Sequence, residues 1–330
     1  MTRFVIIGGS GFVGQWLVKR WAAEGRTLLV DDIAAFPDNS VGGFEYADVD
    51  IRDDAALQRL RLSPNDVVIH LAANQYHLRP PRKGRKAYFF NTNVEGTRNI
   101  LEAMEKGGCH RLVYFSTDMV YGKPDGLPVK TDHPKCPFGY YGASKWASET
   151  LCEAYREKGM NITIFRPRMI IGPGRLGVLK KLFRLIQWGL PVPLIGNGSN
   201  CYQMVSVFDV VEAICLAVQK GCPNKAYNLG SCNPPTVLSL MKALIHKERS
   251  RSVVLKTPGK CVKRVLGLLG ALGIEILYKE QYEIADEQYI VDTEETEKDL
   301  GWHPRFNDAD MLQEAYRQYI ELTGNALSRK

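Results

Sequence analysis

Tyr141 and Lys145 are the residues of this chain best suited to acid–base chemistry. They stand at positions i and i+4 of the run Tyr140–Lys145, so on a helix they share one face. A phenol, with an ordinary pKa of about 10, is a poor base near neutral pH. An ammonium about 5 Å away, at an effective dielectric of about 20, favours the phenolate by roughly 3 kcal/mol, or about two pKa units. We therefore expect Tyr141 to accept a proton from an alcohol, although this spacing also arises by chance on amphipathic helices.

Two hydroxyl residues, Ser116 and Thr117, follow the apolar run that ends at Phe115. Such a run predicts a buried strand, and ligands bind beyond the carboxyl ends of the strands in open α/β sheets. Thr117 is therefore placed to bond a substrate hydroxyl beside Tyr141. Taken alone, either hydroxyl is better explained as one that caps a turn.

A glycine-rich turn follows the first apolar run of the chain. Gly8, Gly11 and Gly14 have the spacing G-x-x-G-x-x-G, and an amphipathic run over 15–21 comes next. The first glycine allows a tight turn, the second lets a diphosphate approach the backbone, and the third lets the helix lie close to the strand. Amides at the helix start then face the phosphates. The pattern favours a dinucleotide site, and an ordinary glycine-rich turn is the alternative.

The next apolar run, Leu28–Val30, ends in Asp31 and Asp32. An acid about 20 residues beyond the glycines is placed to bond ribose hydroxyls, and it repels a 2′-phosphate. We expect NAD rather than NADP for that reason. Spacing does not separate the two acids: one is the expected ribose ligand, and the other is a helix-start or surface acid.

Short apolar runs alternate with helical patterns through the first half of the chain. This alternation is typical of an α/β fold with a Rossmann-like, doubly wound parallel sheet. The expected strands are 4–7, 27–31, 44–47, 67–71, 112–116 and 162–166, and the expected helices are 12–24, 54–61, 88–106 and 141–158.

The second half is richer in proline, and its helical patterns are less regular. We therefore expect an NAD-binding domain over 1–167 and a smaller C-terminal substrate-binding domain over 168–202 and 221–330. The stretch 203–220 is interpreted as a strand, a cap and a helix that rejoin the first sheet. A last amphipathic helix is expected over 308–322, with Asp308 as its cap.

Composition indicates a globular protein with reduced cysteines. The chain has 330 residues, of which 45% are hydrophobic, and its eight cysteines form no C-x-x-C pair. This pattern indicates neither a metal site nor a disulfide framework, and it favours a cytoplasmic setting. The first expected strand begins near Arg3, which leaves no room for a signal peptide. The longest apolar run, 265–274, has about half of the roughly 20 residues needed to span a bilayer.

The formal net charge of +7 is partly concentrated in one short segment, the basic loop, which contains Arg79, Arg82, Lys83, Arg85 and Lys86. It is either a solvated loop or a surface that attracts an anionic substrate or an anionic lipid surface. Nucleic acid is not expected as a partner, because no recognition motif accompanies the charge.

The chain resembles the extended short-chain dehydrogenases/reductases of the NAD-dependent epimerase/dehydratase family, which includes UDP-glucose 4-epimerase. The matching motifs stand in family order along nearly the whole chain. They are Gly8–Gly14, Ala47–Asp53, His70–Ala73, Asn93–Thr97, Ser116–Thr117, Val120–Gly122, Tyr141 with Lys145, Arg166–Pro167, Gly172–Gly174 and Leu300–Pro304.

The resemblance implies roles for many of these residues. Thr117, Tyr141 and Lys145 would form the catalytic set, with Lys145 also holding the nicotinamide ribose. The cofactor would be NAD, and its binding residues would be Gly8, Gly11, Phe12, Val13, Gly14, Asp31, Asp32, Asp50, Ile51, Leu71, Ala72, Ala73, Asn93, Tyr141, Lys145 and Pro167. Of these, Asp50 and Ile51 would flank the adenine. The resemblance also implies a homodimer built from helices near 88–106 and 141–158.

The implied reaction is hydride transfer at a secondary alcohol, in which Tyr141 removes the hydroxyl proton. An epimerase turns the resulting ketone over and returns the hydride to its opposite face. We expect an NAD-dependent epimerase that acts on a sugar carried on a nucleotide or polyprenyl diphosphate. One alternative is a 3β-hydroxysteroid-type dehydrogenase or reductase of a hydrophobic hydroxy substrate. The other is a non-catalytic NAD-sensing protein, against which the intact Tyr141 and Lys145 argue.

Two positions expected to contact the substrate depart from the family pattern. Nucleotide-sugar members usually carry Asn after the Arg-Pro pair and Arg before the strand at 205–207, where this chain has Met169 and Tyr202. Binding a diphosphate then requires another cation, such as Arg168, Arg175 or the basic loop.

A third departure concerns Met119, which stands where sugar 4,6-dehydratases carry their glutamate base. Elimination is therefore not expected, while Asp118 is retained as a polar contact to the substrate.

Two segments of the second half are similar to lipid-related branches of the family. Gly196–Asn200 with Met204 resembles both the steroid dehydrogenases and the epimerases of sugars carried by polyprenyl diphosphate. The apolar segment 262–277 is a core helix of the substrate domain, a cap over a lipid-facing pocket or a helix that lies on a membrane.

Overall fold

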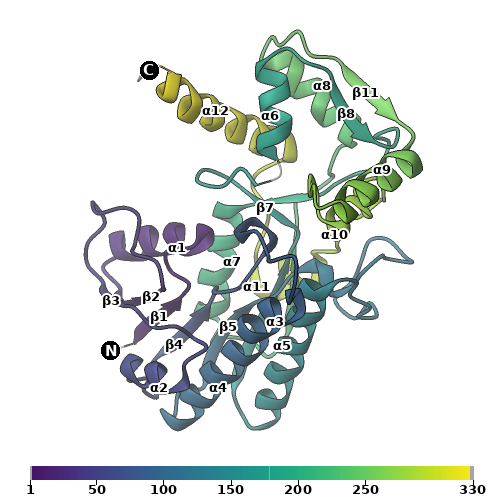
Figure 1. Ribbon diagram of the computed structural model, residues 1–330. Helices are drawn as coiled ribbons and strands as arrows, with labels where there is room; N and C mark the ends of the chain where they lie inside the picture. Colours follow the sequence, from purple (N-terminus) through teal and green to yellow (C-terminus); the bar gives the residue numbers. More distant parts are fainter. Residues whose placement is uncertain (1, 178, 328–330) are drawn as a thin grey trace.

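The computed structural model describes residues 2–177 and 179–327 (Figure 1). Its main element is a parallel sheet of seven strands in the order β10-β6-β5-β4-β1-β2-β3. The strands are β1 (Arg3–Ile7), β2 (Thr27–Asp31), β3 (Glu45–Ala47), β4 (Val67–His70), β5 (Arg111–Phe115), β6 (Asn161–Pro167) and β10 (Ala226–Leu229). The expected α/β fold with a Rossmann-like parallel sheet is confirmed.

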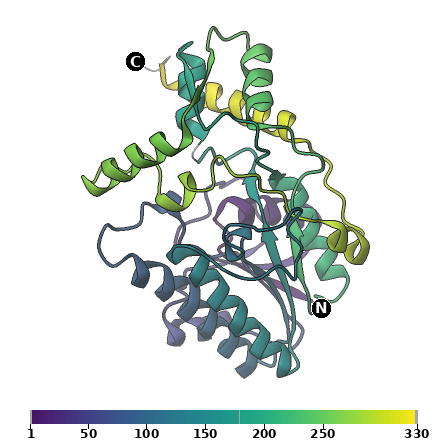
Figure 2. The ribbon, with the colours of Figure 1, turned by 90° about the vertical axis from the view of Figure 1, so that its right-hand side faces the viewer.

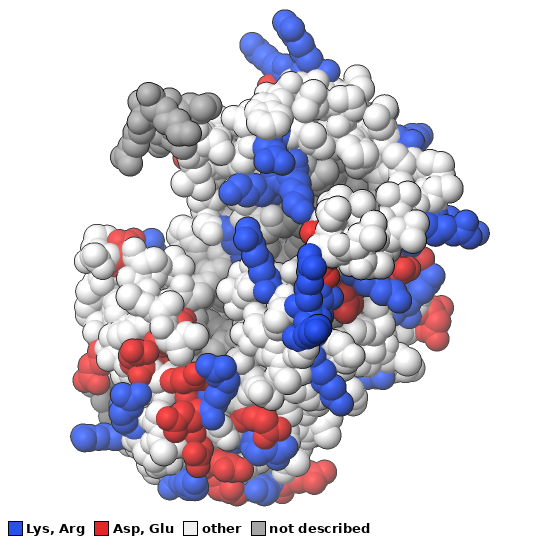
Figure 3. Space-filling view, in the orientation of Figure 1, with Lys and Arg blue, Asp and Glu red and all other residues white. Residues whose placement is uncertain are grey.

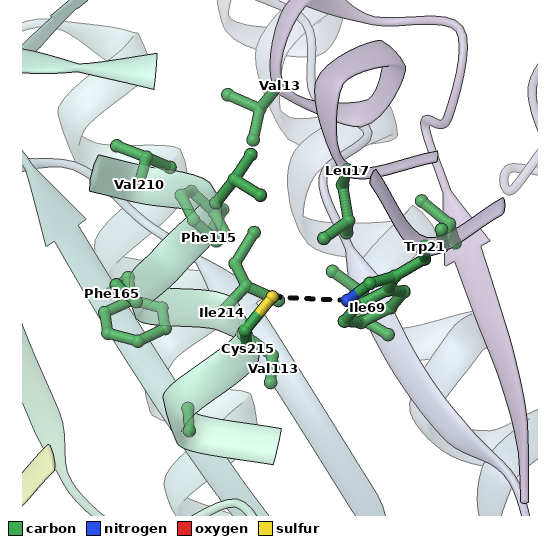
Figure 4. Packing of buried hydrophobic residues seen from close by; sticks show 14 of the residues in the cluster. Val13, Leu17, Trp21, Ile69, Val113, Phe115, Phe165, Val210, Ile214 and Cys215 are labelled. Atoms are coloured by element: carbon green, nitrogen blue, oxygen red, sulfur yellow. Dashed lines mark hydrogen bonds between the residues drawn. The ribbon is translucent and has the colours of Figure 1, made fainter. Parts of the chain in front are cut away.

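Helices cover both faces of this sheet, so its strands are apolar almost without interruption. On one face Ile6 and Ile69 pack with α1 (Phe12–Ala23) and α7 (Val207–Gln219). Figure 4 shows this core, in which Trp21 Nε1 donates to Cys215 Sγ at 3.2 Å.

On the other face of the sheet, Val5 and Val68 pack with α4 (Gly96–Lys106) and α5 (Tyr140–Glu157). The two helices lie side by side along the sheet (Figure 2). The alternation of neighbouring strand residues between the two faces follows the period-two geometry of a strand.

The expected helix over 88–106 is interrupted. The structure has α3 (Arg85–Phe90), a π-helical turn (Asn91–Glu95) and then α4. The expected helix over 54–61 is likewise α2 (Asp54–Leu57) followed by a 3₁₀ turn (Gln58–Leu60). Hydrophobic spacing predicts that a helix exists, but it does not detect a local change in the hydrogen-bonding pattern.

A second core lies above the carboxyl ends of the strands and defines the C-terminal part. It is formed by α6 (Leu179–Gln187), β8 (Val192–Ile195), α8 (Val237–Lys247), β11 (Val254–Thr257) and α12 (Asp308–Leu327). Strands β8 and β11 form a two-stranded parallel sheet. Between this core and the large sheet, β7 (Met169–Ile171) pairs with β9 (Met204–Ser206). The remaining helices are α9 (Gly259–Ala271), α10 (Lys279–Tyr282) and α11 (Glu294–Leu300).

The chain returns to the large sheet in a different way from the one expected. Helix α7 packs on the sheet, but the strand that precedes it, β9, pairs with β7 rather than with the sheet. The seventh strand of the sheet is instead β10, which lies within the stretch 221–330 assigned to the substrate-binding domain. Trp302, also from that stretch, is fully buried in the core beneath α1 and α7. The two-domain division stays a prediction. Strand β10 and Trp302 depart from it, because both belong to the stretch assigned to the substrate-binding domain but pack with the large sheet.

Asp308 begins α12 as expected, and its carboxylate has a tertiary partner. The buried Asp308 Oδ1 accepts a hydrogen bond from the Met204 amide at 2.8 Å. None of the helices described over 2–177 and 179–327 has the length and apolarity needed to cross a membrane.

His70, at the end of β4, is buried, and its Nε2 lies 3.0 Å from Thr97 Oγ1. Burial, followed by the charge of Lys145, lowers the pKa of His70 from its ordinary value of 6.5 to about 3. At a pH between these two pKa values, His70 is protonated in the unfolded chain and neutral in the folded protein. The stability contributed by neutral His70 is therefore complete above pH about 6.5 and is lost as the pH falls.

We expect this one group to remove about 2 kcal/mol of stability between pH 7 and pH 5. Urea unfolding of the wild type and of His70→Gln at both pH values tests this, because other titrating groups cancel between the two proteins. The stability difference between wild type and variant should shrink by about that amount at pH 5. A difference that is the same at both pH values would contradict the prediction.

Candidate active site

The glycine turn between β1 and α1 approaches other backbone segments too closely for side chains. Gly8 has a φ of +83°, and a Cβ there would lie 2.5 Å from the Ala72 amide nitrogen. A Cβ on Gly14 would lie 2.5 Å from the Gly8 carbonyl oxygen. In the described structure no side chain caps the start of α1, so its first amides are available to phosphate oxygens. The turn has the geometry that a dinucleotide diphosphate requires.

The structure separates the two acids at the end of β2. Asp31 has no exposed surface, and its Oδ1 accepts a hydrogen bond from the Val49 amide at 3.0 Å. Burial raises the pKa of Asp31 to about 7. Asp32 is half-buried against the glycine turn, where its carboxylate accepts from the Ser10 amide at 3.0 Å and from the Ala34 amide at 3.1 Å. Asp32 is therefore the acid we expect to bond ribose hydroxyls, and Asp31 supports the fold.

The segment after β4 forms the wall of the turn. The amides of Leu71 and Ala72 donate to the Ile7 carbonyl at 2.8 and 3.1 Å. This contact places the half-buried 71–73 segment beside the glycine turn, as expected for residues that line a cofactor.

The other expected cofactor residues are more dispersed. Ile51 packs beneath Gly96, where a Cβ would lie 2.5 Å from its Cδ1. The Asp50 carboxylate pairs with Arg52 at 2.5 Å. Val13 points into the core, Phe12 lies near Gly174, and Pro167 ends β6. No contact within the chain tests their roles toward NAD, which stay predictions.

Asn93 occupies the π-helical turn and connects two elements of the site. Its Oδ1 accepts from the Asn74 amide at 2.8 Å, and its Nδ2 donates to Ser144 Oγ at 2.9 Å. Its carbonyl accepts from Ser148 Oγ at 2.6 Å. The turn thus ties α5, which carries Tyr141, to the segment after β4. Single π turns are frequent at functional sites.

Tyr141 and Lys145 both lie on α5, and both are buried. Thr117 follows β5, and its Oγ1 donates to Asp118 Oδ1 at 3.1 Å. Burial raises the pKa of Tyr141 and is the largest influence on it, while the positive charge of Arg175 and hydrogen bonding with Thr117 and Gln75 oppose that rise. The structure therefore brings Thr117 and Tyr141 together at the carboxyl edge of the sheet.

The expected effect of Lys145 on Tyr141 is not seen. The Lys145 ammonium lies over the ring of Tyr114, 4.4 Å from its centroid, and the cation that acts on Tyr141 is Arg175. The prediction of a lowered phenol pKa is wrong for this structure, because the burial that accompanies the i, i+4 pairing was not included in it. Burial also lowers the pKa of Lys145, to about 7.

Arg175 and two neighbours complete the surroundings of Tyr141. Arg175 Nη2 donates to Gln75 Oε1 at 2.7 Å, and its guanidinium lies 5.8 Å from the ring centroid of Phe12. The Tyr76 ring packs edge-on against Tyr141, with centroids 5.6 Å apart. Sequence analysis did not identify Gln75 or Tyr76. The one signal for them was their position directly after the His70–Ala73 motif.

Asp118 forms a buried ion pair with Arg168. The Arg168 guanidinium lies between two rings, 4.8 Å from the centroid of Tyr202 and 4.1 Å from that of Tyr289. Tyr289 donates its hydroxyl hydrogen to the Asp118 carbonyl at 2.9 Å. Asp118 and Tyr202, both expected to contact substrate, are thus joined through Arg168, whose charge is already compensated. Met169 lies half-buried at the start of β7.

Comparison with known proteins agrees with this geometry. Residues 4–230 match the model of the NAD dependent epimerase/dehydratase family. The chain belongs to this family.

Two relatives are 30% identical to the chain. One is an uncharacterized protein of Sinorhizobium fredii, matched over 96% of this chain and 78% of its own length. The other is the N-acetyl-α-D-glucosaminyl-diphospho-ditrans,octacis-undecaprenol 4-epimerase of Escherichia coli O157:H7, matched over 89% of this chain and 84% of its own length. The fold is also similar to that of UDP-glucose 4-epimerase from Thermotoga maritima, with a TM-score of 0.80, 23% identity, and coverage of 98% of this chain and 100% of that one.

The separation of the two acids can be tested by NAD binding. Asp32→Asn retains an acceptor for the Ser10 amide but removes the charge, so we expect the Kd for NAD to rise by about tenfold. Asp31→Asn is the matched control, and we expect it to leave the Kd unchanged, because Asp31 is turned toward Val49. Titration calorimetry measures both constants. Weakened binding in Asp31→Asn alone would reverse the assignment.

Proposed function

We propose that this protein is an NAD-dependent epimerase that acts on a sugar carried on a nucleotide or polyprenyl diphosphate. The observation that carries the proposal is the buried Tyr141 on α5, whose phenol lies where Thr117, Gln75 and Arg175 act on it. Membership of the family supports the cofactor and the reaction class. The relatives include epimerases of sugars on both kinds of carrier.

Bound NAD would accept the hydride of a secondary alcohol and return it. The glycine turn and the start of α1 would hold its diphosphate, and Asp32 its adenine ribose. Lys145 lies one helical turn beyond Tyr141, where it would hold the nicotinamide ribose. The residues present therefore fit this cofactor.

Tyr141 acts as the proton acceptor for the substrate hydroxyl in this proposal. Burial holds the phenol protonated in the resting site and excludes water from it. Arg175, Thr117 and Gln75 favour the phenolate and offset part of the rise that burial causes in the pKa of Tyr141, which is the direction of effect expected of Lys145. The same phenol returns the proton when the ketone is reduced again, as an epimerase requires.

The Asp118–Arg168 pair argues against a dehydratase. Elimination of water from a sugar needs an acid and a base free to exchange protons with the substrate. Here the Asp118 carboxylate is committed to Arg168 in a buried pair, and the next residue is Met119. An epimerase needs neither a free carboxylate at Asp118 nor an acid at the position of Met119, because Tyr141 carries out its proton transfer.

One observation favours the alternative, a dehydrogenase or reductase of a hydrophobic hydroxy substrate. Because Arg168 is neutralised by Asp118, it does not supply the cation missing at Met169 and Tyr202. That function predicts stoichiometric NADH production, whereas an epimerase recycles its cofactor without a net change in absorbance. The homodimer likewise stays a prediction from the family resemblance.

Incubation with UDP-hexoses and with lipid-linked sugars from membrane extracts, without added NAD, tests the main proposal. We expect conversion of at least one of them to its epimer, with NAD retained by the protein. No turnover of any of these substrates, together with NADH production from a hydrophobic alcohol, would favour the alternative.

If Tyr141 transfers the proton, removing its hydroxyl oxygen should strongly lower the catalytic rate. We expect Tyr141→Phe to lower kcat by about 100-fold or more, because proton transfer by a positioned side chain contributes 10²–10⁴. Tyr140→Phe is the matched control, since Tyr140 is the preceding residue of the same helix and is exposed. Progress curves measure both, with circular dichroism to establish folding. Full activity in Tyr141→Phe would remove Tyr141 from the mechanism.

A further inference from the structure

Helix α9 presents an apolar stripe to solvent. Val265, Leu268 and Leu272 are exposed by 54%, 68% and 77%, and Ile274 follows at 55%. The first three follow one another at helical spacing, so they lie on one side of the helix and its end. None of the residues of α9, all of which is described, is buried. The interpretation of this segment as a core helix is therefore wrong, because its outer side is apolar and exposed.

The inner side of α9 is held to the C-terminal part, which orients the stripe outward. Lys263 Nζ donates to the Glu283 carbonyl at 2.7 Å and pairs with Asp286 at 2.5 Å. The helix lies at the margin of the molecule in Figure 1 and Figure 2. Val262 and Leu266 of the same helix are half-buried. The exposed stripe is therefore a second apolar side of α9, and it faces solvent.

Positive charge surrounds the stripe. Helix α9 contains no Asp or Glu, and Lys260 and Arg264 on it are exposed. The basic loop contacts the segment that follows α9, where Arg82 donates to the Gly273 carbonyl and Arg85 pairs with Glu275. Figure 3 shows Lys and Arg side chains gathered along the border of the hollow between the sheet and the C-terminal part. Apolar side chains flanked by lysine and arginine are typical of helices that lie in the surface of anionic membranes.

The stripe is also connected to the reaction site. The chain that leaves α9 reaches Tyr278, whose ring packs on that of Tyr76 with centroids 4.9 Å apart. Tyr76 in turn packs on Tyr141. Two ring contacts thus join Tyr278 to the proton-accepting phenol, and a short segment of chain joins Tyr278 to the end of the stripe.

We propose that α9 and the segment 272–276 dock on the surface of an anionic lipid bilayer, with Leu268, Leu272 and Ile274 entering the boundary between headgroups and acyl chains. Lys260, Arg264 and the basic loop contact the lipid phosphates. A second copy of the chain fits less well, because a two-fold contact through this face would bring the same cations of both copies together. This inference goes beyond the proposed function, since it concerns where the protein binds and not which reaction it catalyses.

Cosedimentation of the full chain with phosphatidylcholine vesicles, with and without phosphatidylglycerol, tests the proposal. We expect binding to the mixed vesicles that weakens as salt is added, and at least tenfold weaker binding to phosphatidylcholine alone. Leu268→Glu and Leu272→Glu should each reduce binding to the mixed vesicles about tenfold. Leu322→Glu is the matched control: Leu322 is 60% exposed on α12, outside the stripe, and its replacement should leave vesicle binding unchanged.

Three outcomes would overturn the proposal: no binding of the wild type to mixed vesicles, equal loss in Leu322→Glu, or self-association by light scattering that Leu268→Glu abolishes without any vesicle binding. The last would assign the stripe to a second copy. The NAD affinity of Leu268→Glu provides the folding control. Because vesicle binding needs no turnover, it can succeed or fail independently of the epimerase assay.

Discussion

The convergence of three backbone segments at the carboxyl edge of the sheet is the constraint on which the site depends. The amides of Gly8 and Gly9 donate to the Asp31 carbonyl, and those of Leu71 and Ala72 donate to that of Ile7. These bonds join the ends of β1, β2 and β4 so closely that position 8 has no room for a Cβ. Within a buried parallel sheet the backbone groups bond one another. At the carboxyl edge, the bonds that hold the glycine turn leave the first amides of α1 without a side-chain partner among the described residues, so these amides can bind phosphate.

The chemistry at this edge is decided by a balance between burial and charge. Burial, together with the negative charge of Asp118, raises the pKa of the Tyr141 phenol, and Arg175, Thr117 and Gln75 offset part of that rise. These three residues come from three separate segments of the chain. The acidity of the phenol is therefore a property of how the C-terminal part and the segment after β4 meet α5, and not of α5 itself. Arg168 does not act on the phenol in this way, because its charge is paired with that of Asp118 inside the fold.

Much of this could be predicted from the order of residue types. The six expected strands appear in the structure within a residue or two of their expected ends. For all of them but the edge strand β3, which is largely exposed, the reason is that a strand buried on both faces consists of a short apolar run. The glycine turn was predictable because its spacing, G-x-x-G-x-x-G, can be recognised without knowing its contacts, although the segment that excludes a Cβ at Gly8 is that of the distant Ala72. The π-helical turn at Asn93 and the pairing of β9 with β7 were not, because each depends on partners outside its own segment.

The sequence by itself determined the fold class, the glycine turn, and the presence of a tyrosine and a lysine on one helical face, since each is recorded in the spacing of residue types along the chain. Only the tertiary structure decided which of Asp31 and Asp32 faces the turn, which cation acts on Tyr141, and that the apolar side of α9 is exposed. Each of these depends on residues brought together from distant parts of the chain, and the energies of burial and of charge are set by all the neighbours of a group in space.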